Sequence, residues 1–229
     1  MTKFSFEVPI QHLEDFEEYM DYTFALSFLL KDIQYASYIN RKVKEGGLVM
    51  LDNSYNEIQK AETPSHMANL CKLFNPTFVM APDADDFQVE DVVDNAIRVK
   101  ELVGEDKTMA IYKNFEEREV LENAGIKHLA VSYYWRPFFP KEYSHPGAHF
   151  LGINSVDELI RHKPATVDSS MPLKMALAGY TLRDWIGSGC PHWHTKQDPM
   201  FFQNNLTKEV IDLTIQNIIA LKEAVNGQG

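Results

Sequence analysis

Residues 149–170 read HFLGINSVDELIRHKPATVDSS, and this stretch indicates the fold. Two short apolar runs, 149–153 and 165–167, flank a segment that begins like a helix, because Ser155 and Glu158 have the spacing of a capping box. Strand, helix and strand in so short a span predict two parallel strands joined by a crossover helix. The second strand ends at Asp168, so a carboxylate is expected at the tip of a buried strand.

The same alternation extends over the whole chain. Apolar runs typical of buried strands lie at 4–9, 24–30, 48–51, 77–81, 109–112, 129–133, 150–153 and 166–168. Helical patterns lie at 35–43, 65–74, 89–103, 115–124, 155–162 and 207–225. We therefore predict an α/β protein with one domain over residues 1–229, a compact (β/α)8 barrel of the TIM type with some helices reduced or missing. An open doubly wound sheet is the alternative.

The composition narrows the class of protein. A chain of 229 residues that is 45% hydrophobic can bury one full core. No apolar run approaches the roughly 20 residues that span a bilayer, and the first residues are charged where a signal peptide is apolar. We expect a soluble cytoplasmic protein with no membrane partner. Two cysteines are too few for a disulfide framework, and a net charge of −11 argues mildly against non-specific binding to nucleic acid.

Three predicted strands end in an aspartate: Asp52, Asp83 and Asp168. The carboxyl ends of parallel strands share one rim, which is where barrels place their chemistry. Converging carboxylates can act as nucleophile, acid or base, and their repulsion raises the pKa of at least one of them. The structural alternative is that each aspartate caps the helix that follows it.

The stretch 149–172, together with MLDNSYNE and APDADD, resembles the tRNA-guanine transglycosylase superfamily. The short chain is most similar to the compact phage and bacterial branch, which inserts 7-deazaguanine bases into DNA. The resemblance implies base exchange by a glycosyltransferase through a covalent intermediate. Asp168 would be the nucleophile, Asp52 the acid or base, and Asp83 the residue that reads the edge of the base.

The resemblance also implies the remaining site and the partners. The base pocket would be formed by Asn53, Ser54, Gly152 and Tyr133, although buried core packing is the alternative for Tyr133. Phosphate contacts are expected from the basic side chains Arg136, Lys141, Arg161, Lys163 and Lys196. The implied partners are nucleic acid, DNA rather than tRNA, and a free 7-deazaguanine base. A homodimer or a partner subunit is left open, and the compartment would be the host cytoplasm for a phage-encoded chain.

No cofactor is required by this chemistry, but GCPHWHTK places Cys190, His192 and His194 at a spacing that suits zinc. Relatives in the superfamily carry a structural zinc after the nucleophile. The set here is incomplete, with Asp198 or water as the fourth ligand, and a phosphate-binding loop is the alternative. Two other functions stay open: a non-catalytic base-binding barrel in a modification complex, and an unrelated carboxylate-using barrel hydrolase or lyase.

Overall fold

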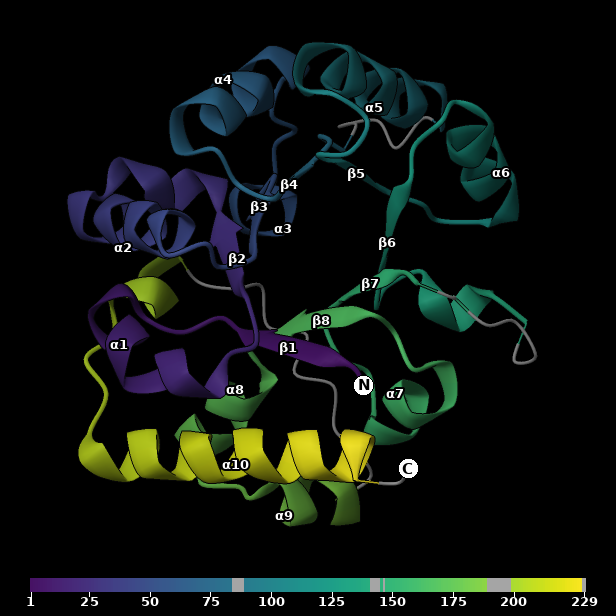
Figure 1. Cartoon of the computed structure of the whole chain (residues 1–229). Helices are drawn as coiled ribbons and strands as arrows, with labels where there is room; N and C mark the ends of the chain where they lie inside the picture. The colour runs from purple at the N-terminus through teal and green to yellow at the C-terminus, as the bar shows by residue number, and fades with distance from the viewer. Residues whose placement is uncertain (84–88, 141–144, 146, 189–198, 228–229) are drawn as a thin grey trace. The chain divides into compact units, whose positions relative to one another are not determined.

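The computed structural model describes residues 1–83, 89–140, 145, 147–188 and 199–227, in which strands and helices alternate along the chain (Figure 1). The strands are β1 (Lys3–Phe6), β2 (Thr23–Leu26), β3 (Val49–Asp52), β4 (Phe78–Met80), β5 (Thr108–Ile111), β6 (His128–Ser132), β7 (His149–Leu151) and β8 (Thr166–Ser169). The α-helices are α1 (Leu13–Phe16), α2 (Ile33–Lys44), α3 (Tyr55–Ile58), α4 (Pro64–Phe74), α5 (Val89–Val103), α6 (Phe115–Asn123), α7 (Val156–His162), α8 (Met171–Leu177), α9 (Leu182–Gly187) and α10 (Lys208–Asn226). The 3-10 helices are η1 (Ile10–His12), η2 (Glu17–Tyr19), η3 (Ser27–Lys31), η4 (Arg136–Phe138) and η5 (Pro199–Gln203).

The chain divides into two compact units. Unit 1 comprises Met1–Asp21 and Lys141–Gly229, and unit 2 comprises Tyr22–Pro140. The strands of unit 1 follow the spatial order β1-β8-β7, and those of unit 2 follow β2-β3-β4-β5-β6. Every pairing within a unit is parallel. Eight parallel strands with helices between them confirm the predicted (β/α)8 fold, whereas the single-domain organisation stays a prediction.

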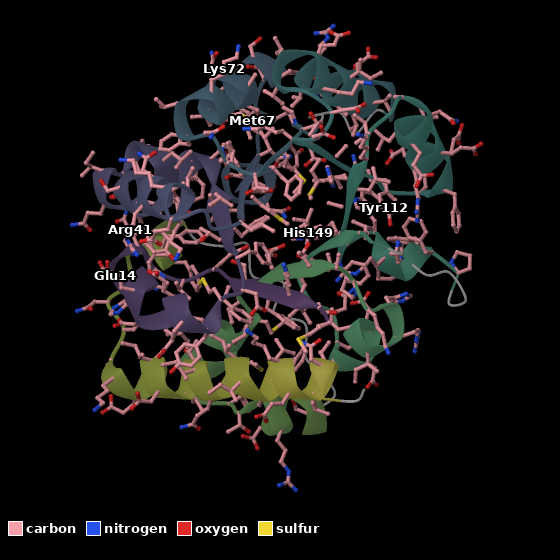
Figure 2. The ribbon with its side chains drawn as sticks, in the orientation of Figure 1. Glu14, Arg41, Met67, Lys72, Tyr112 and His149 are labelled. Atoms are coloured by element: carbon pink, nitrogen blue, oxygen red, sulfur yellow. The ribbon has the colours of Figure 1, made fainter. Side chains whose placement is uncertain are left out.

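The elements of unit 2 follow from simple sequence signals. Every residue of β2, β3 and β5 is buried, as expected for parallel strands that helices cover on one side and a core on the other. Helix α4 starts at the Thr63 cap, whose side chain accepts the N–H of His66, and at Pro64 in its first turn. Figure 2 shows its two faces, with Met67 buried and Lys72 exposed.

One predicted strand of unit 2 is too long. The apolar run 24–30 reads as a single strand, but β2 ends at Leu26 and the chain continues as the 3-10 helix η3. The hydroxyl of Tyr35, on α2, accepts the backbone N–H of Leu26 at 2.9 Å. This buried side chain satisfies a backbone donor that a longer ladder would otherwise use, so the strand can stop there.

In unit 1, α10 packs against α7, α8 and α9. Its buried positions recur at helical spacing and include two polar residues that an apolar pattern does not single out: Thr214, Asn217, Ile218, Leu221 and Val225. Asn217 is 1% exposed and makes hydrogen bonds to three backbone groups. Its Oδ1 accepts the N–H of Leu182 at 2.8 Å, and its Nδ2 donates to the carbonyls of Pro172 at 3.3 Å and Tyr180 at 3.0 Å. Within the described residues, no helix combines the length and apolar character needed to cross a membrane.

Asn217 is expected to be a large contributor to the stability of unit 1. Asn217→Ala leaves one N–H and two carbonyls without their partner, and each unsatisfied buried group costs about 1–3 kcal/mol, so we expect a loss of about 3 kcal/mol. Urea unfolding measures this loss. The control is Gln216→Ala, an exposed neighbour on the same helix. Equal losses in the two variants would contradict the role of the three hydrogen bonds.

Candidate functional site

A tight turn of polar residues follows β3. Asp52 is 7% exposed, and its Oδ2 accepts the backbone N–H of Ser54 at 2.7 Å. Ser54 is buried with a φ of 57°, a conformation that is uncommon outside glycine, and its hydroxyl accepts a hydrogen bond from Ser27 at 3.0 Å. The Asp52 carboxylate is therefore fixed by the backbone that follows it, and its acid or base role stays a prediction.

Asn53 connects this turn to the end of β4. Its Nδ2 donates to the carbonyl of Ala81 at 2.8 Å and to Oδ2 of Asp83 at 3.4 Å, and its Oδ1 accepts the N–H of Tyr55 at 3.0 Å. The structure thus brings together two of the predicted base-pocket residues, Asn53 and Asp83. Buried polar side chains thus lie together at the ends of β3 and β4, as expected for neighbouring parallel strands.

Asp83 lies in an environment that favours its neutral form more than water does. It is 9% exposed, and burial raises its pKa above the usual value, an effect that the charge of Lys113 and the hydrogen bond from Asn53 partly oppose. Lys113 comes two residues after the end of β5 and is itself only 7% exposed. A buried carboxylate and a buried amine therefore lie at the ends of adjacent strands β4 and β5.

Glu117, in the first turn of α6, completes this arrangement. It is 1% exposed, and its Oε2 accepts the backbone N–H of Lys113 at 2.6 Å. Burial raises the pKa of Glu117; the N–H and the charge of Lys113 lower it, and the charges of Asp83 and Glu116 raise it. Asp83, Lys113 and Glu117 are called the Lys113 cluster below. The Lys113 Nζ also lies 5.7 Å from the centre of the Trp135 ring, a distance at which an ammonium is attracted to the aromatic face.

The raised pKa of Glu117 predicts a specific dependence of stability on pH. The folded protein holds this proton more tightly than the unfolded chain, so the contribution of Glu117 is greatest at low pH. It is lost as the pH rises from the ordinary glutamate value of 4.5 through the raised folded value. Glu117→Gln is therefore expected to gain stability relative to wild type across that window.

Denaturant unfolding at a series of pH values checks this expectation. Glu119→Gln, an exposed neighbour on α6, serves as the control. If the two variants change stability in parallel at every pH, burial does not perturb Glu117 as described.

Unit 1 holds a second group of buried polar side chains, on β7 and β8. His149 is 1% exposed, and Figure 2 labels it on β7. Its Nε2 lies 3.1 Å from Oδ1 of Asp168, and its Nδ1 lies 2.9 Å from the hydroxyl of Thr166. The parallel register places His149 opposite Thr166 and Leu151 opposite Asp168. Asp168, 4% exposed, is thus held by a histidine, and its role as a nucleophile stays a prediction.

The remaining predicted residues have varied surroundings. Gly152 has a φ of 74°, and its N–H donates to the backbone carbonyl of Asp168 at 3.2 Å, so these two predicted residues do meet. The ring of Tyr133 is half-buried and lies 5.1 Å from that of Tyr134. Convergence of Asp168 with Asp52 and Asp83 stays a prediction, because the two units are described separately.

The predicted phosphate contacts differ in exposure. Arg136 is 5% exposed, and its Nη1 donates to the carbonyl of Val131 at 3.0 Å, so it anchors the chain after β6. Arg161 and Lys163 are exposed at the end of α7, where a positive charge also stabilises the helix dipole. Outside the described residues lie Lys141, Lys196 and the zinc set Cys190, His192, His194 and Asp198. Among the residues that are described, no group of three or more His, Cys, Asp or Glu side chains is placed to hold a metal ion.

Lys113, Glu117 and His149 are not among the site residues that the sequence patterns predict. The segment AIYKNFEE does contain a signal, because Lys113 follows an apolar strand just as Asp52 and Asp83 do. Glu117 lies four residues later, on the same face of a helix that starts there. His149 gives no such signal, since its contact with Asp168 depends on the register between two strands.

Comparisons with known proteins support the fold but do not assign the chain to a family. No family model matches the chain, and neither does any curated protein. The solved structure called "Native KDPGal structure" is 9% identical and covers 97% of this chain and 94% of its own, with a TM-score of 0.50. "Crystal structure of KGPDC from Streptococcus mutans" is also 9% identical, covering 82% of this chain and 98% of its own, with a TM-score of 0.48. At this identity the first likeness shows a shared fold alone.

The assignment to the transglycosylase superfamily is wrong. No family model and no curated protein supports the resemblance, and the solved structure that shares the fold is described as KDPGal and not as a transglycosylase. The prediction of a glycosyltransferase is wrong for the same reason. Physically, a short strand that ends in aspartate and small residues is what any (β/α)8 barrel presents at its rim, so the motif reports the fold rather than the reaction.

Proposed function

We propose that this chain is a (β/α)8 lyase that breaks or forms a carbon–carbon bond next to a carbonyl group. The observation that supports it is the Lys113 cluster: a buried amine, after β5, whose charge lowers the pKa of two buried carboxyl groups. This is the rim at which barrels of this fold place catalytic side chains. The reading agrees with the barrel lyase left open by the sequence, and the aldolase and decarboxylase neighbours add an analogy of fold.

Lys113 would act as an ammonium ion. When a carbon–carbon bond next to a carbonyl breaks, the electron pair moves onto the carbonyl oxygen and gives an enolate. A fixed positive charge in a site of low dielectric stabilises that oxygen far more than water does. The charge of Lys113 lowers the pKa of both Asp83 and Glu117, and its Nζ lies over the Trp135 ring, where an ammonium is attracted to the aromatic face. We therefore take Lys113 as an electrostatic catalyst and not as an amine that attacks the carbonyl.

Asp83 would act as the general base and acid. Its raised pKa brings it closer to neutral pH, where a group can both accept and return a proton. For a β-hydroxy carbonyl substrate, Asp83 takes the hydroxyl proton and the bond between the α and β carbons breaks. An aldehyde or ketone leaves, and the enolate oxygen rests against Lys113. The enolate carbon then takes the proton back from Asp83, which restores the enzyme.

The neighbours of this pair have positioning roles. Asn53 holds the Asp83 carboxylate through Nδ2 and is itself fixed by the Ala81 carbonyl and the Tyr55 N–H. Glu117 fixes the backbone of Lys113 at the start of α6. Such support keeps catalytic groups within the narrow range of geometry that a reaction needs.

Solvent exchange tests the proposal without knowledge of the natural substrate. The chain is incubated in D2O with pyruvate, 2-oxobutyrate, dihydroxyacetone or glycolaldehyde, and proton NMR follows the hydrogens next to the carbonyl. An enzyme that stabilises an enolate should accelerate deuterium incorporation into at least one compound over the rate in buffer. Rates equal to those in buffer for all four would contradict an enolate-forming lyase.

A further inference from the structure

Aromatic side chains lead from the Lys113 cluster to the surface of unit 2. The Lys113 Nζ lies over the Trp135 ring, 5.7 Å from its centre, and the centre of the Phe138 ring lies 6.1 Å from that of Trp135, with an angle of 45° between the two rings. Lys113 is 7% exposed, Trp135 is half-buried and Phe138 is 77% exposed. Trp135 and Phe138 are called the aromatic row below. Of its two rings, Trp135 lies next to the buried amine of Lys113 and Phe138 is exposed to solvent.

The turn that carries the aromatic row is anchored to buried residues of unit 2. Trp135 precedes the 3-10 helix η4, in which Pro137 restricts the backbone and Arg136 anchors it through the Val131 carbonyl. The next residue, Phe139, is buried edge-on against Tyr112 at 5.9 Å. Phe138 is therefore displayed by a turn whose neighbours are fixed in the core. An exposed aromatic ring near a buried amine offers an apolar contact and a positive charge, the two kinds of group that hold a flat anionic ligand.

The chemistry of the row defines its ligand. An aromatic ring gains most from another flat ring, stacked or edge-on, beyond the area that is buried. The ammonium of Lys113 attracts a carbonyl oxygen or a carboxylate. We propose that the aromatic row is a subsite for the planar ring of a 2-oxo acid whose oxygens reach Lys113. The inference rests on the proposed function and adds the class of substrate: a 2-oxo acid with an aryl or other flat substituent.

Binding of benzoylformate tests this subsite. This 2-oxo acid joins a phenyl ring to the carbonyl and has no hydrogen next to it, so binding is measured by calorimetry without any exchange. We expect benzoylformate to bind about tenfold more tightly than pyruvate, in keeping with the strength of an aromatic pair. Cyclohexylglyoxylate, similar in size but not planar, should bind several-fold more weakly than benzoylformate.

Two variants complete the experiment. Phe138→Ala should remove most of the preference for benzoylformate over pyruvate. Because the Phe138 side chain is 77% exposed, its removal should leave the fold intact. The matched control is Leu73→Ala on α4, where a side chain that is 72% exposed lies away from the Lys113 cluster and should leave both affinities unchanged.

A wild-type protein that binds benzoylformate no better than pyruvate would overturn the subsite, as would a preference that Phe138→Ala leaves intact. Equal binding of cyclohexylglyoxylate would overturn the planar class. The lyase proposal can fail while the subsite stands. This is the outcome if no deuterium exchange is found but the preference for benzoylformate over pyruvate is present and depends on Phe138.

Discussion

Replacing Lys113 with glutamine is expected to lower enzyme-catalysed deuterium exchange by about a hundred- to a thousand-fold, the range found when one group that stabilises a developing oxyanion is removed. Glutamine keeps a polar side chain but loses the positive charge that faces the enolate oxygen. The loss should appear in the rate at saturating substrate, because an interaction made mainly in the transition state affects turnover. Proton NMR with the most active compound of the exchange panel gives the measurement.

The same strand offers a matched control for this variant. Lys107 lies just before β5, whereas Lys113 lies just beyond its other end, and the Lys107 ammonium donates to the side chain of Asn75. Lys107→Gln removes an equal charge from the amino end of the strand and should leave exchange within about twofold of wild type, as expected for a change outside the rim. Comparable losses in both variants, or none in Lys113→Gln, would contradict a role for this amine.

Asp168→Ala is expected to cost about 3–5 kcal/mol of folding free energy, because it breaks a buried pair and leaves His149 without the carboxylate. A helix cap at this position would cost only about 1 kcal/mol. Urea unfolding separates the two values. Asp157→Ala, at an exposed position in the first turn of α7, is the control and should change stability by only about 0.3–1 kcal/mol.

A double-mutant cycle makes this second prediction stricter. His149→Ala and Asp168→Ala should each destabilise the fold, and their combination should cost clearly less than the sum, since both remove one interaction. Additive losses, or a loss near 1 kcal/mol for Asp168→Ala, would show that the contact at 3.1 Å contributes little.

The fold could be predicted because its signals are local. Each of the eight strands coincides with an apolar run, and α5 covers the predicted residues 89–103. The end of β2 was placed too late because it depends on a contact outside the local apolar pattern: the hydroxyl of Tyr35, on the following helix, accepts the N–H of Leu26. Helix α9 was missed although Thr181 and Asp184 form a capping box, a signal that the sequence TLRD contains.

The site was predictable only in part. The rule that strands end at the rim found Asp52 and Asp83, and the same rule applied to lysine would have found Lys113. This rule could not predict the reaction, because the end of a strand determines where a side chain lies but not which groups surround it. The burial of Asp83 and Glu117 depends on tertiary packing, and so does the contact of His149 with Asp168.

Borohydride trapping tests the central claim most directly, namely that Lys113 works as a charged ammonium ion. The wild-type chain is treated with sodium borohydride in the presence of pyruvate, and its intact mass and exchange rate are then measured. The account predicts an unchanged mass and continued exchange, because no imine between Lys113 and the carbonyl forms for the hydride to reduce. A stable adduct that peptide mapping places on Lys113, together with loss of exchange, would contradict it.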